Sequence, residues 1–315
     1  MIAARFWAPG DVRIEHVPEP TPGPGDLVIA VEAALTCGTD AKCYHRGHPV
    51  LLGPAPARFG HEYAGTVIAV GEGAPFHTGE RVCGVNSAPC GDCPHCAAGR
   101  EELCSDLYPL LNGAYAEQLL IPARIAATNV HLLPDGVPLE VAPALEPLAC
   151  AVHGADDAGA RPGLRMAVVG RGPLGRMLQL ACRSAGAECE LLGRDEGEPQ
   201  GYDSVIEAAG TAEAWQRAID LTAPGGTAVI FGGLPRGTMV PVDSFRLHYE
   251  ALTFKGSFHH RPRDVRVALD LLAEDPAPIA DLLTHEFRLE EVVVPLERSA
   301  GIVPRDGLLK AVIRP

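Results

Sequence analysis

The chain has 315 residues, of which 47% are hydrophobic, 26 are basic and 40 are acidic, for a formal net charge of −14. A chain of this length exceeds the usual size of one hydrophobic core, so we expect two globular domains. The acidic balance repels nucleic-acid phosphates and anionic membrane surfaces. Neither a signal peptide nor a bilayer-spanning apolar run is visible. We therefore expect a cytoplasmic protein that binds neither nucleic acid nor membrane.

The first half of the chain reads as short extended segments separated by turns. Apolar or alternating runs predict strands over residues 12–17, 27–31, 63–70 and 115–121. From about Glu146 apolar strands alternate with amphipathic helices, which is typical of a parallel sheet built from βαβ units. The last segment returns to short extended pieces such as 308–313. We predict an α/β protein with a β-rich domain over 1–149, completed by 284–315, and a Rossmann dinucleotide-binding domain over 150–283.

A cluster of cysteines in the first domain has the spacing C-x2-C-x2-C-x7-C and comprises Cys90, Cys93, Cys96 and Cys104. This spacing predicts four thiolates around one tetrahedral zinc ion, with no position open for a substrate. The site is therefore expected to be structural. Four free thiols in a surface loop and an iron–sulfur cluster are the alternatives, although nothing else in the chain indicates electron transfer.

A second possible metal site combines different donor types. Cys37, the pair His61-Glu62 and Glu146 offer one sulfur, one nitrogen and two carboxylate donors. Three protein ligands plus an exchangeable position allow zinc to polarise a carbonyl or activate a bound hydroxyl. Each residue alone has an ordinary structural explanation, since a buried histidine is often a hydrogen-bonded core residue and Glu146 precedes a proline that suits a helix start.

A glycine-rich motif opens the second half of the chain. The apolar run 166–169 is followed by G-x-G-x-x-G and then by a helical stretch over 176–185. In this strand–turn–helix context the motif predicts a dinucleotide site, with pyrophosphate at the helix N-terminus. The expected cofactor-binding residues of this loop are Gly170, Gly172, Pro173, Leu174 and Gly175.

The next strand, 188–192, ends in Gly193-Arg194 where a Rossmann unit usually has an acidic residue for the ribose 2′-hydroxyl. A glycine removes repulsion toward a 2′-phosphate and Arg194 can pair with it, so NADP(H) is favoured over NAD(H). Two alternatives stay open: Arg194 is an exposed loop charge, or Asp195 accepts a ribose hydroxyl.

The connection after this strand is unusually short. Only residues 195–202 precede the next buried strand, 203–210, whereas a crossover between parallel strands needs a dozen or so residues. We therefore expect a shortened Rossmann half that lacks the edge strand 3 of the order 3-2-1-4-5-6. Further strands are expected over 228–233 and 254–258, and the cofactor site is expected to include Gly210, Gly232 and Ser257.

These motifs together resemble the zinc-containing medium-chain dehydrogenase/reductase family, in particular its polyol and threonine dehydrogenase-like branch. The resemblance rests on Cys37-Gly38-Thr39-Asp40, Gly60-His61-Glu62, the cysteine cluster, Glu146-Pro147-Leu148, the glycine motif, Pro224-Gly225-Gly226 and Lys255-Gly256-Ser257-Phe258. It implies a GroES-like catalytic domain, whose catalytic zinc is held by Cys37, His61 and Glu146.

The resemblance also implies roles around that zinc. Glu62 would orient the ligands or serve as an alternative ligand, Asp40 would orient ligands, and Thr39 would pass the substrate proton toward solvent. Lys42 stands where many members have a histidine, so the outer end of the relay lies at Lys42, His45 or bulk water.

The predicted activity is hydride transfer between a nicotinamide cofactor and a small alcohol, polyol or matching carbonyl. A zinc-independent double-bond reductase of the same fold and a non-catalytic zinc- or nucleotide-binding protein are the alternatives. By the resemblance, the protein is expected to be a homodimer or homotetramer.

Overall fold

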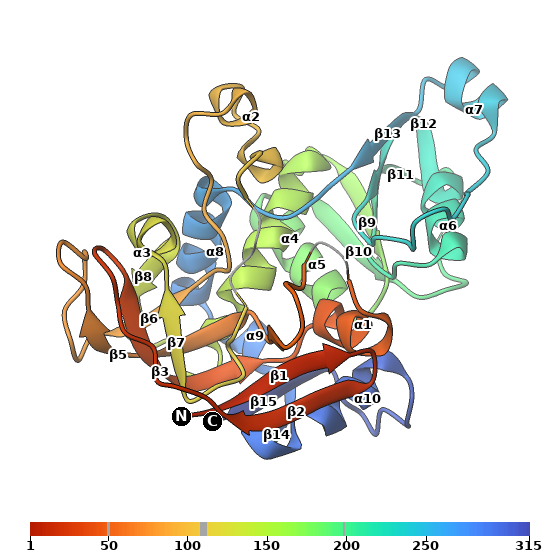
Figure 1. The fold of residues 1–315 in the computed structure, drawn as a ribbon. Coiled ribbons are helices and arrows are strands. Elements are labelled where there is room, and N and C mark those ends of the chain that lie inside the picture. The colour runs from red at the N-terminus through yellow and green to blue at the C-terminus, as the bar shows by residue number, and fades with distance from the viewer. Residues whose placement is uncertain (49–50, 108–111, 198) are drawn as a thin grey trace. The chain divides into compact units, whose positions relative to one another are not determined.

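The computed structural model describes residues 1–48, 51–107, 112–197 and 199–315. These form two compact units, Met1–Glu146 with Arg261–Pro315, and Pro147–His260 (Figure 1). Within the described ranges, no helix is long and apolar enough to cross a membrane.

The first unit contains two sheets. A three-stranded sheet has the order β2-β1-β4, and a seven-stranded sheet has the order β14-β15-β3-β5-β6-β8, with β7 also paired to β3. The strands are β1 (Ile2–Ala8), β2 (Asp11–His16), β3 (Leu27–Leu35), β4 (Ala57–Arg58), β5 (Glu62–Val70), β6 (Arg81–Gly84), β7 (Gln118–Ile121), β8 (Val130–Leu132), β14 (Leu283–Arg288) and β15 (Lys310–Arg314).

The helices of this unit are short except for α8, which has 13 residues. They are α1 (Gly38–Arg46), α2 (Pro94–Ala97), α3 (Ala123–Asn129), α8 (Pro262–Glu274), α9 (Ala277–Ala280) and α10 (Val293–Ala300), with 3-10 turns at Glu101–Leu103, Ala142–Ala144 and Leu289–Glu291. The central strand β3 is almost wholly apolar because it is buried and pairs with β5, β7 and β15. The C-terminal strand thus completes the sheet that the N-terminal segment begins.

The second unit is a parallel sheet with helices. Its strands β9 (Arg165–Val169), β10 (Glu188–Leu192), β11 (Tyr202–Glu207), β12 (Thr222–Ile230) and β13 (Thr253–Gly256) have the order β10-β9-β11-β12-β13, and every pair is parallel. The helices are α5 (Pro173–Ser184), α6 (Ala212–Leu221) and α7 (Ser244–Tyr249), while α4 (Leu145–Asp157) begins with the last residues of the first unit.

The predicted fold class and the shortened Rossmann half are confirmed. Strand β10 lies at the sheet edge, and among the described residues between Leu192 and Tyr202 there is neither helix nor strand. An edge strand beyond β10 is therefore absent from the described chain, as the short connection predicted.

Three details differ from the predictions. The last segment joins the first unit from Arg261 rather than from residue 284, because α8 packs on α3 of that unit, and the first unit ends at Glu146 rather than at residue 149. That segment also contains helix α10, not only extended pieces. The expected strand 203–210 ends at Glu207, because residues 208–210 form a turn bound to the Glu207 carboxylate.

Candidate active site and metal centres

Cys37 lies at the N-cap of helix α1, where backbone and side chains close a capping box. The Cys37 sulfur accepts a hydrogen bond from the Thr39 amide at 3.4 Å, and Asp40 Oδ2 accepts one from the Cys37 amide at 3.2 Å. These contacts hold the sulfur at the positive end of the helix.

His61 is buried one residue before strand β5. The preceding Gly60 has φ +81°, and a Cβ on it would lie 2.6 Å from the Tyr115 ring, so the turn requires glycine. His61 Nδ1 is 3.0 Å from Asp40 Oδ1, and the Tyr115 hydroxyl donates to Asp40 Oδ2 at 2.6 Å. Asp40 therefore fixes the imidazole and leaves Nε2 available to a ligand.

The structure brings the four expected donors of the mixed metal site together within the first unit. One ligand atom from each of Cys37, His61 and Glu62 lies within 4.8 Å of the others. Glu146, in the first turn of α4, has Oε2 3.9 Å from His61 Nε2. One sulfur, one imidazole nitrogen and carboxylate oxygens are a donor set that zinc accepts, so these residues fit the metal.

The electrostatics of this cluster favour a positive charge beside His61. Burial alone would lower the pKa of His61, but the Asp40 carboxylate and its hydrogen bond raise that pKa well above its usual value. A zinc ion would supply the same charge at Nε2.

Glu62 is bound by a residue that the sequence analysis did not identify. Lys310 of β15 places Nζ 2.6 Å from Glu62 Oε2 and donates to the Thr36 carbonyl at 2.9 Å. Burial raises the pKa of Glu62 to about 7, against the opposing effect of the Lys310 charge. The only sequence signal for Lys310 is a lysine inside the apolar run 308–313.

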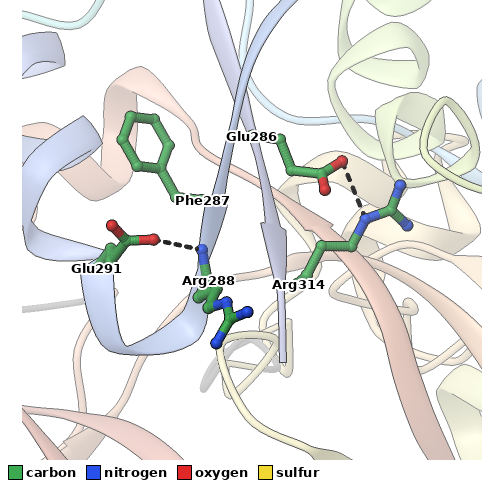
Figure 2. A pocket seen from close by; sticks show the side chains of 5 residues that line it. All are labelled: Glu286, Phe287, Arg288, Glu291 and Arg314. Atoms are coloured by element: carbon green, nitrogen blue, oxygen red, sulfur yellow. Dashed lines mark hydrogen bonds and ion pairs between the residues drawn. The ribbon is translucent and has the colours of Figure 1, made fainter.

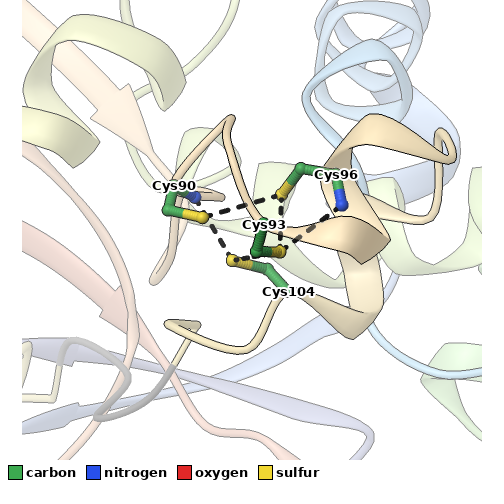
Figure 3. A group of neighbouring side chains, drawn as sticks. All are labelled: Cys90, Cys93, Cys96 and Cys104. Carbon is green, nitrogen blue, oxygen red and sulfur yellow. Dashed lines mark hydrogen bonds between the residues drawn. The ribbon is translucent and has the colours of Figure 1, made fainter.

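The four-cysteine cluster also assembles (Figure 3). Its sulfurs are 3.5 Å apart for Cys93 and Cys96, and 4.0 Å apart for both Cys90–Cys96 and Cys93–Cys104. Tetrahedral coordination at 2.3 Å requires sulfur–sulfur distances of roughly 3.8 Å. The backbone amides of Cys96 and Ser105 lower the pKa of Cys93 to about 5. The pKa of Cys90 is raised to about 12, mainly by a hydrogen bond with Asp92, and burial raises the pKa of Cys96. The sulfur spacing, together with the low pKa of Cys93, fits zinc.

The residues expected in the proton relay lie along α1. Thr39 is half-buried next to Cys37, whereas Lys42 and His45 are both exposed. Because both side chains reach solvent, Lys42 and His45 each meet the requirement for the outer end of the relay.

The glycine motif adopts the expected strand–turn–helix arrangement in the second unit. Gly172 is the N-cap of α5, with Pro173 and Leu174 in the first turn. Gly170 has φ +127°, and a Cβ on Gly175 would lie 1.8 Å from the Gly170 carbonyl oxygen. Only glycines allow this close approach of helix to strand, and the turn leaves the first amides of α5 available to phosphate.

A buried carboxylate organises the carboxyl ends of the neighbouring strands. Glu207 Oε1 accepts from the amides of Ala209 at 2.7 Å and Gly210 at 2.5 Å, and Oε2 accepts from Gly232 at 3.0 Å. It therefore ties together two of the glycines assigned to the cofactor site. Ser257 is buried just after β13, and its amide donates to Ile230. Glu207 was not among the expected site residues, because the strand sequence Tyr202–Glu207 already contains other polar residues and nothing in it distinguishes this carboxylate.

Arg194 is exposed in the turn after β10. Asp195, the alternative ribose ligand, is exposed as well. The Glu196 carboxylate accepts a hydrogen bond from the Gly193 amide.

A separate surface pocket lies on β14 and β15 (Figure 2). Its lining residues are Glu286, Phe287, Arg288, Glu291 and Arg314. Arg314 Nε is 3.2 Å from Glu286 Oε2, and Glu291 accepts from the Arg288 amide at 3.0 Å. Among the described residues, those lining this pocket include none of the expected site residues.

Comparison with known proteins shows which families this chain is similar to. Residues 23–135 match the model of the alcohol dehydrogenase GroES-like domain, and residues 192–274 match that of the zinc-binding dehydrogenase family. The chain is 30% identical to L-threonine 3-dehydrogenase of Aeromonas hydrophila, over 89% of this chain and 90% of the relative. It is also 30% identical to the Deinococcus deserti protein of the same name, over 86% and 88% of the two chains.

Solved structures show the same relationship. A zinc-binding dehydrogenase from Sinorhizobium meliloti, bound to NADP, superposes with a TM-score of 0.88 and 29% identity, covering 100% of this chain and 99% of that chain. Alcohol dehydrogenase from Thermus sp. ATN1 has a TM-score of 0.86 and 27% identity, with 100% of both chains covered. The ligand clusters, the glycine loop and these full-length matches together place the chain in the zinc-containing medium-chain dehydrogenase/reductase family.

Proposed function

We propose that the chain is a zinc- and nicotinamide-dependent oxidoreductase acting on a small alcohol or polyol, or on the matching carbonyl. The observation that carries this proposal is the cluster of Cys37, His61 and Glu62, with Glu146 Oε2 3.9 Å from His61 Nε2. Asp40 holds the other ring nitrogen, His61 Nδ1, at 3.0 Å. A buried histidine with a purely structural role would not require sulfur and carboxylate donors near Nε2, whereas a metal-binding histidine would.

Each residue has a part in this chemistry. When bound, zinc polarises the substrate oxygen and nicotinamide exchanges the hydride. Cys37, His61 and Glu146 hold the metal, and Asp40 keeps His61 in the tautomer that can bind it. The Glu62 carboxylate is engaged by Lys310, so we assign it to balancing charge and orienting ligands. The Thr39 hydroxyl carries the substrate proton between the buried cluster and the solvent-exposed face of α1.

The four-cysteine cluster is assigned to a second, structural zinc, because four thiolates leave no position for a substrate. The loop of Gly170, Gly172, Pro173, Leu174 and Gly175 is assigned to the cofactor pyrophosphate, together with Gly210, Gly232 and Ser257 on the neighbouring strand ends. NADP(H) is the favoured cofactor, because Gly193 lacks a side chain and two arginines, Arg171 and Arg194, lie in the adjoining turns.

The alternatives receive less support. A double-bond reductase would not need the mixed ligand set, and a non-catalytic protein would need neither this ligand set nor a complete glycine loop. We further propose a homodimer or homotetramer in the cytoplasm, where a reducing environment keeps the zinc-binding thiols free. Size-exclusion chromatography with light scattering tests the oligomeric state.

The function is tested with His61→Ala. NADP+- and NAD+-dependent oxidation is assayed with L-threonine, polyols and simple secondary alcohols, and NADPH binding is measured by fluorescence. We expect His61→Ala to lower turnover by at least about 100-fold, while NADPH binding stays within about twofold, because zinc contacts the substrate oxygen and not the dinucleotide. His77→Ala, at an exposed histidine of the same unit, is the control. Normal turnover of His61→Ala would exclude zinc catalysis.

A further inference from the structure

The short turn after β10 returns an acidic side chain to the end of the strand. Glu196 Oε2 accepts a hydrogen bond from the Gly193 amide at 3.0 Å, and it also pairs with the Arg171 guanidinium. Arg171 is the second residue of the glycine motif. One amide and one guanidinium thus form an anion site, which is filled by the chain's own carboxylate.

This anion site lies where a Rossmann protein meets the adenosine ribose. Strand β10 is the second strand of the unit, because it pairs in parallel with β9, which leads into the glycine loop. The residue at the end of that strand is the one that reads the ribose 2′-position. Strand β10 ends at Leu192, so the Gly193 amide and the Arg171 guanidinium, which both bind Glu196, lie at this position.

The position of Glu196 is built into the fold. Arg217 of α6 donates to the carbonyls of Glu196 at 2.8 Å and Gly197 at 3.0 Å, which anchors the backbone of the turn. The Gly193 amide, aided by the Arg171 charge, holds the pKa of Glu196 below its usual value. The carboxylate is therefore charged at neutral pH. Both side chains of the ion pair keep about half of their surface exposed, at 54% for Arg171 and 46% for Glu196, so a ligand can reach them.

We propose that Glu196 is an internal competitor for the 2′-phosphate subsite and thereby sets the preference of this protein between NADP(H) and NAD(H). In the free protein Glu196 holds Arg171 and the Gly193 amide. When NADP(H) binds, the 2′-phosphate displaces the carboxylate and takes Arg171 as its partner. NAD(H) has a neutral ribose hydroxyl there and can leave the ion pair in place. This inference rests on the proposed function, in which the second unit binds a nicotinamide dinucleotide.

The test compares Glu196→Gln with Glu188→Gln in fluorescence titrations of the holoenzyme with NADPH and with NADH. Glutamine keeps an oxygen for the Gly193 amide, so Glu196→Gln removes the charge but not the turn. Glu188 is exposed at the start of β10, so Glu188→Gln is a matched control for a general loss of negative charge. We expect Glu196→Gln to raise NADPH affinity about tenfold and to change NADH affinity less than about twofold, because one carboxylate stops competing with the phosphate.

Arg171→Met tests the other side chain of the ion pair. It should weaken NADPH binding about tenfold or more with little effect on NADH, and in the Arg171→Met background Glu196→Gln should lose its effect, because the two residues act through one ion pair. Equal changes in NADPH and NADH affinity, or a Glu188→Gln effect as large as that of Glu196→Gln, would overturn the inference alone. Binding of neither dinucleotide by the unmodified protein would overturn the proposed function as well.

Discussion

Replacing Asp40 by asparagine separates metal binding from folding at the candidate catalytic site. Asp40 joins three partners: His61 Nδ1 at 3.0 Å on Oδ1, and the Tyr115 hydroxyl at 2.6 Å and the Cys37 amide at 3.2 Å on Oδ2. An asparagine of the same shape can satisfy only some of them. If its NH2 group takes the place of Oδ2, it faces the Cys37 amide, so two N–H donors oppose each other. The Cys37 amide belongs to the backbone and cannot reorient.

The other orientation of asparagine is equally unfavourable for zinc. Its NH2 group would then donate to His61 Nδ1, which places the remaining imidazole proton on Nε2 and blocks the nitrogen that faces Glu146. Loss of such an outer partner of a metal-binding histidine costs about 10–100-fold in metal affinity. This corresponds to roughly 1.4–2.8 kcal/mol.

Competition with a chromophoric zinc chelator measures this effect, because it resolves the two zinc sites by affinity. We expect Asp40→Asn to weaken one zinc by about 10–100-fold and to leave the four-cysteine zinc unchanged. Tyr115→Phe, which removes a single donor to Asp40, should weaken the same zinc by less than about tenfold. Zinc affinity of Asp40→Asn within about twofold of the unmodified protein would refute the argument.

Two further predictions concern stability. Lys310→Met leaves the buried Glu62 carboxylate without its partner, so it should lower the free energy of unfolding by about 3–5 kcal/mol in urea titrations. Adding Glu62→Gln should restore part of that loss, and a double variant less stable than Lys310→Met would contradict this. Cys93→Ser should remove one of two zinc ions by metal analysis and lower the melting temperature, since a structural zinc contributes folding free energy; an unchanged melting temperature would argue against a structural role.

Local patterns predicted much of this molecule. Strand β10 was predicted with its observed bounds, and the short segment 195–202 before the next expected strand was enough to predict that a helix and an edge strand are missing. The cysteine spacing was equally informative, because ligands that lie close in the sequence must lie close in space. The domain boundaries were harder to predict, since α8 follows the alternating strands and helices of the second unit in the sequence and yet packs on α3 of the first unit.

Partners that come from distant segments escaped prediction. Lys310 binds Glu62 across 248 positions, and Tyr115 binds Asp40 across 75. No periodicity or spacing connects such residues, because the register between β15, β3 and β5 is set by the packing of the whole sheet. A buried charge in an apolar run indicates that a partner exists, but not which residue it is.

Glu196 belongs to a third category, since a local rule could have found it. An amide with no ladder partner at the end of a strand or turn needs an acceptor. In this chain the acceptor is repeatedly an acidic side chain three residues later, as the Cys37 amide shows with Asp40 and the Arg288 amide with Glu291. The Gly193 amide with Glu196 follows the same pattern at 3.0 Å. A strand end that looks free of negative charge can therefore carry one, and the identity of the strand-end residue alone does not decide which dinucleotide a shortened Rossmann unit prefers.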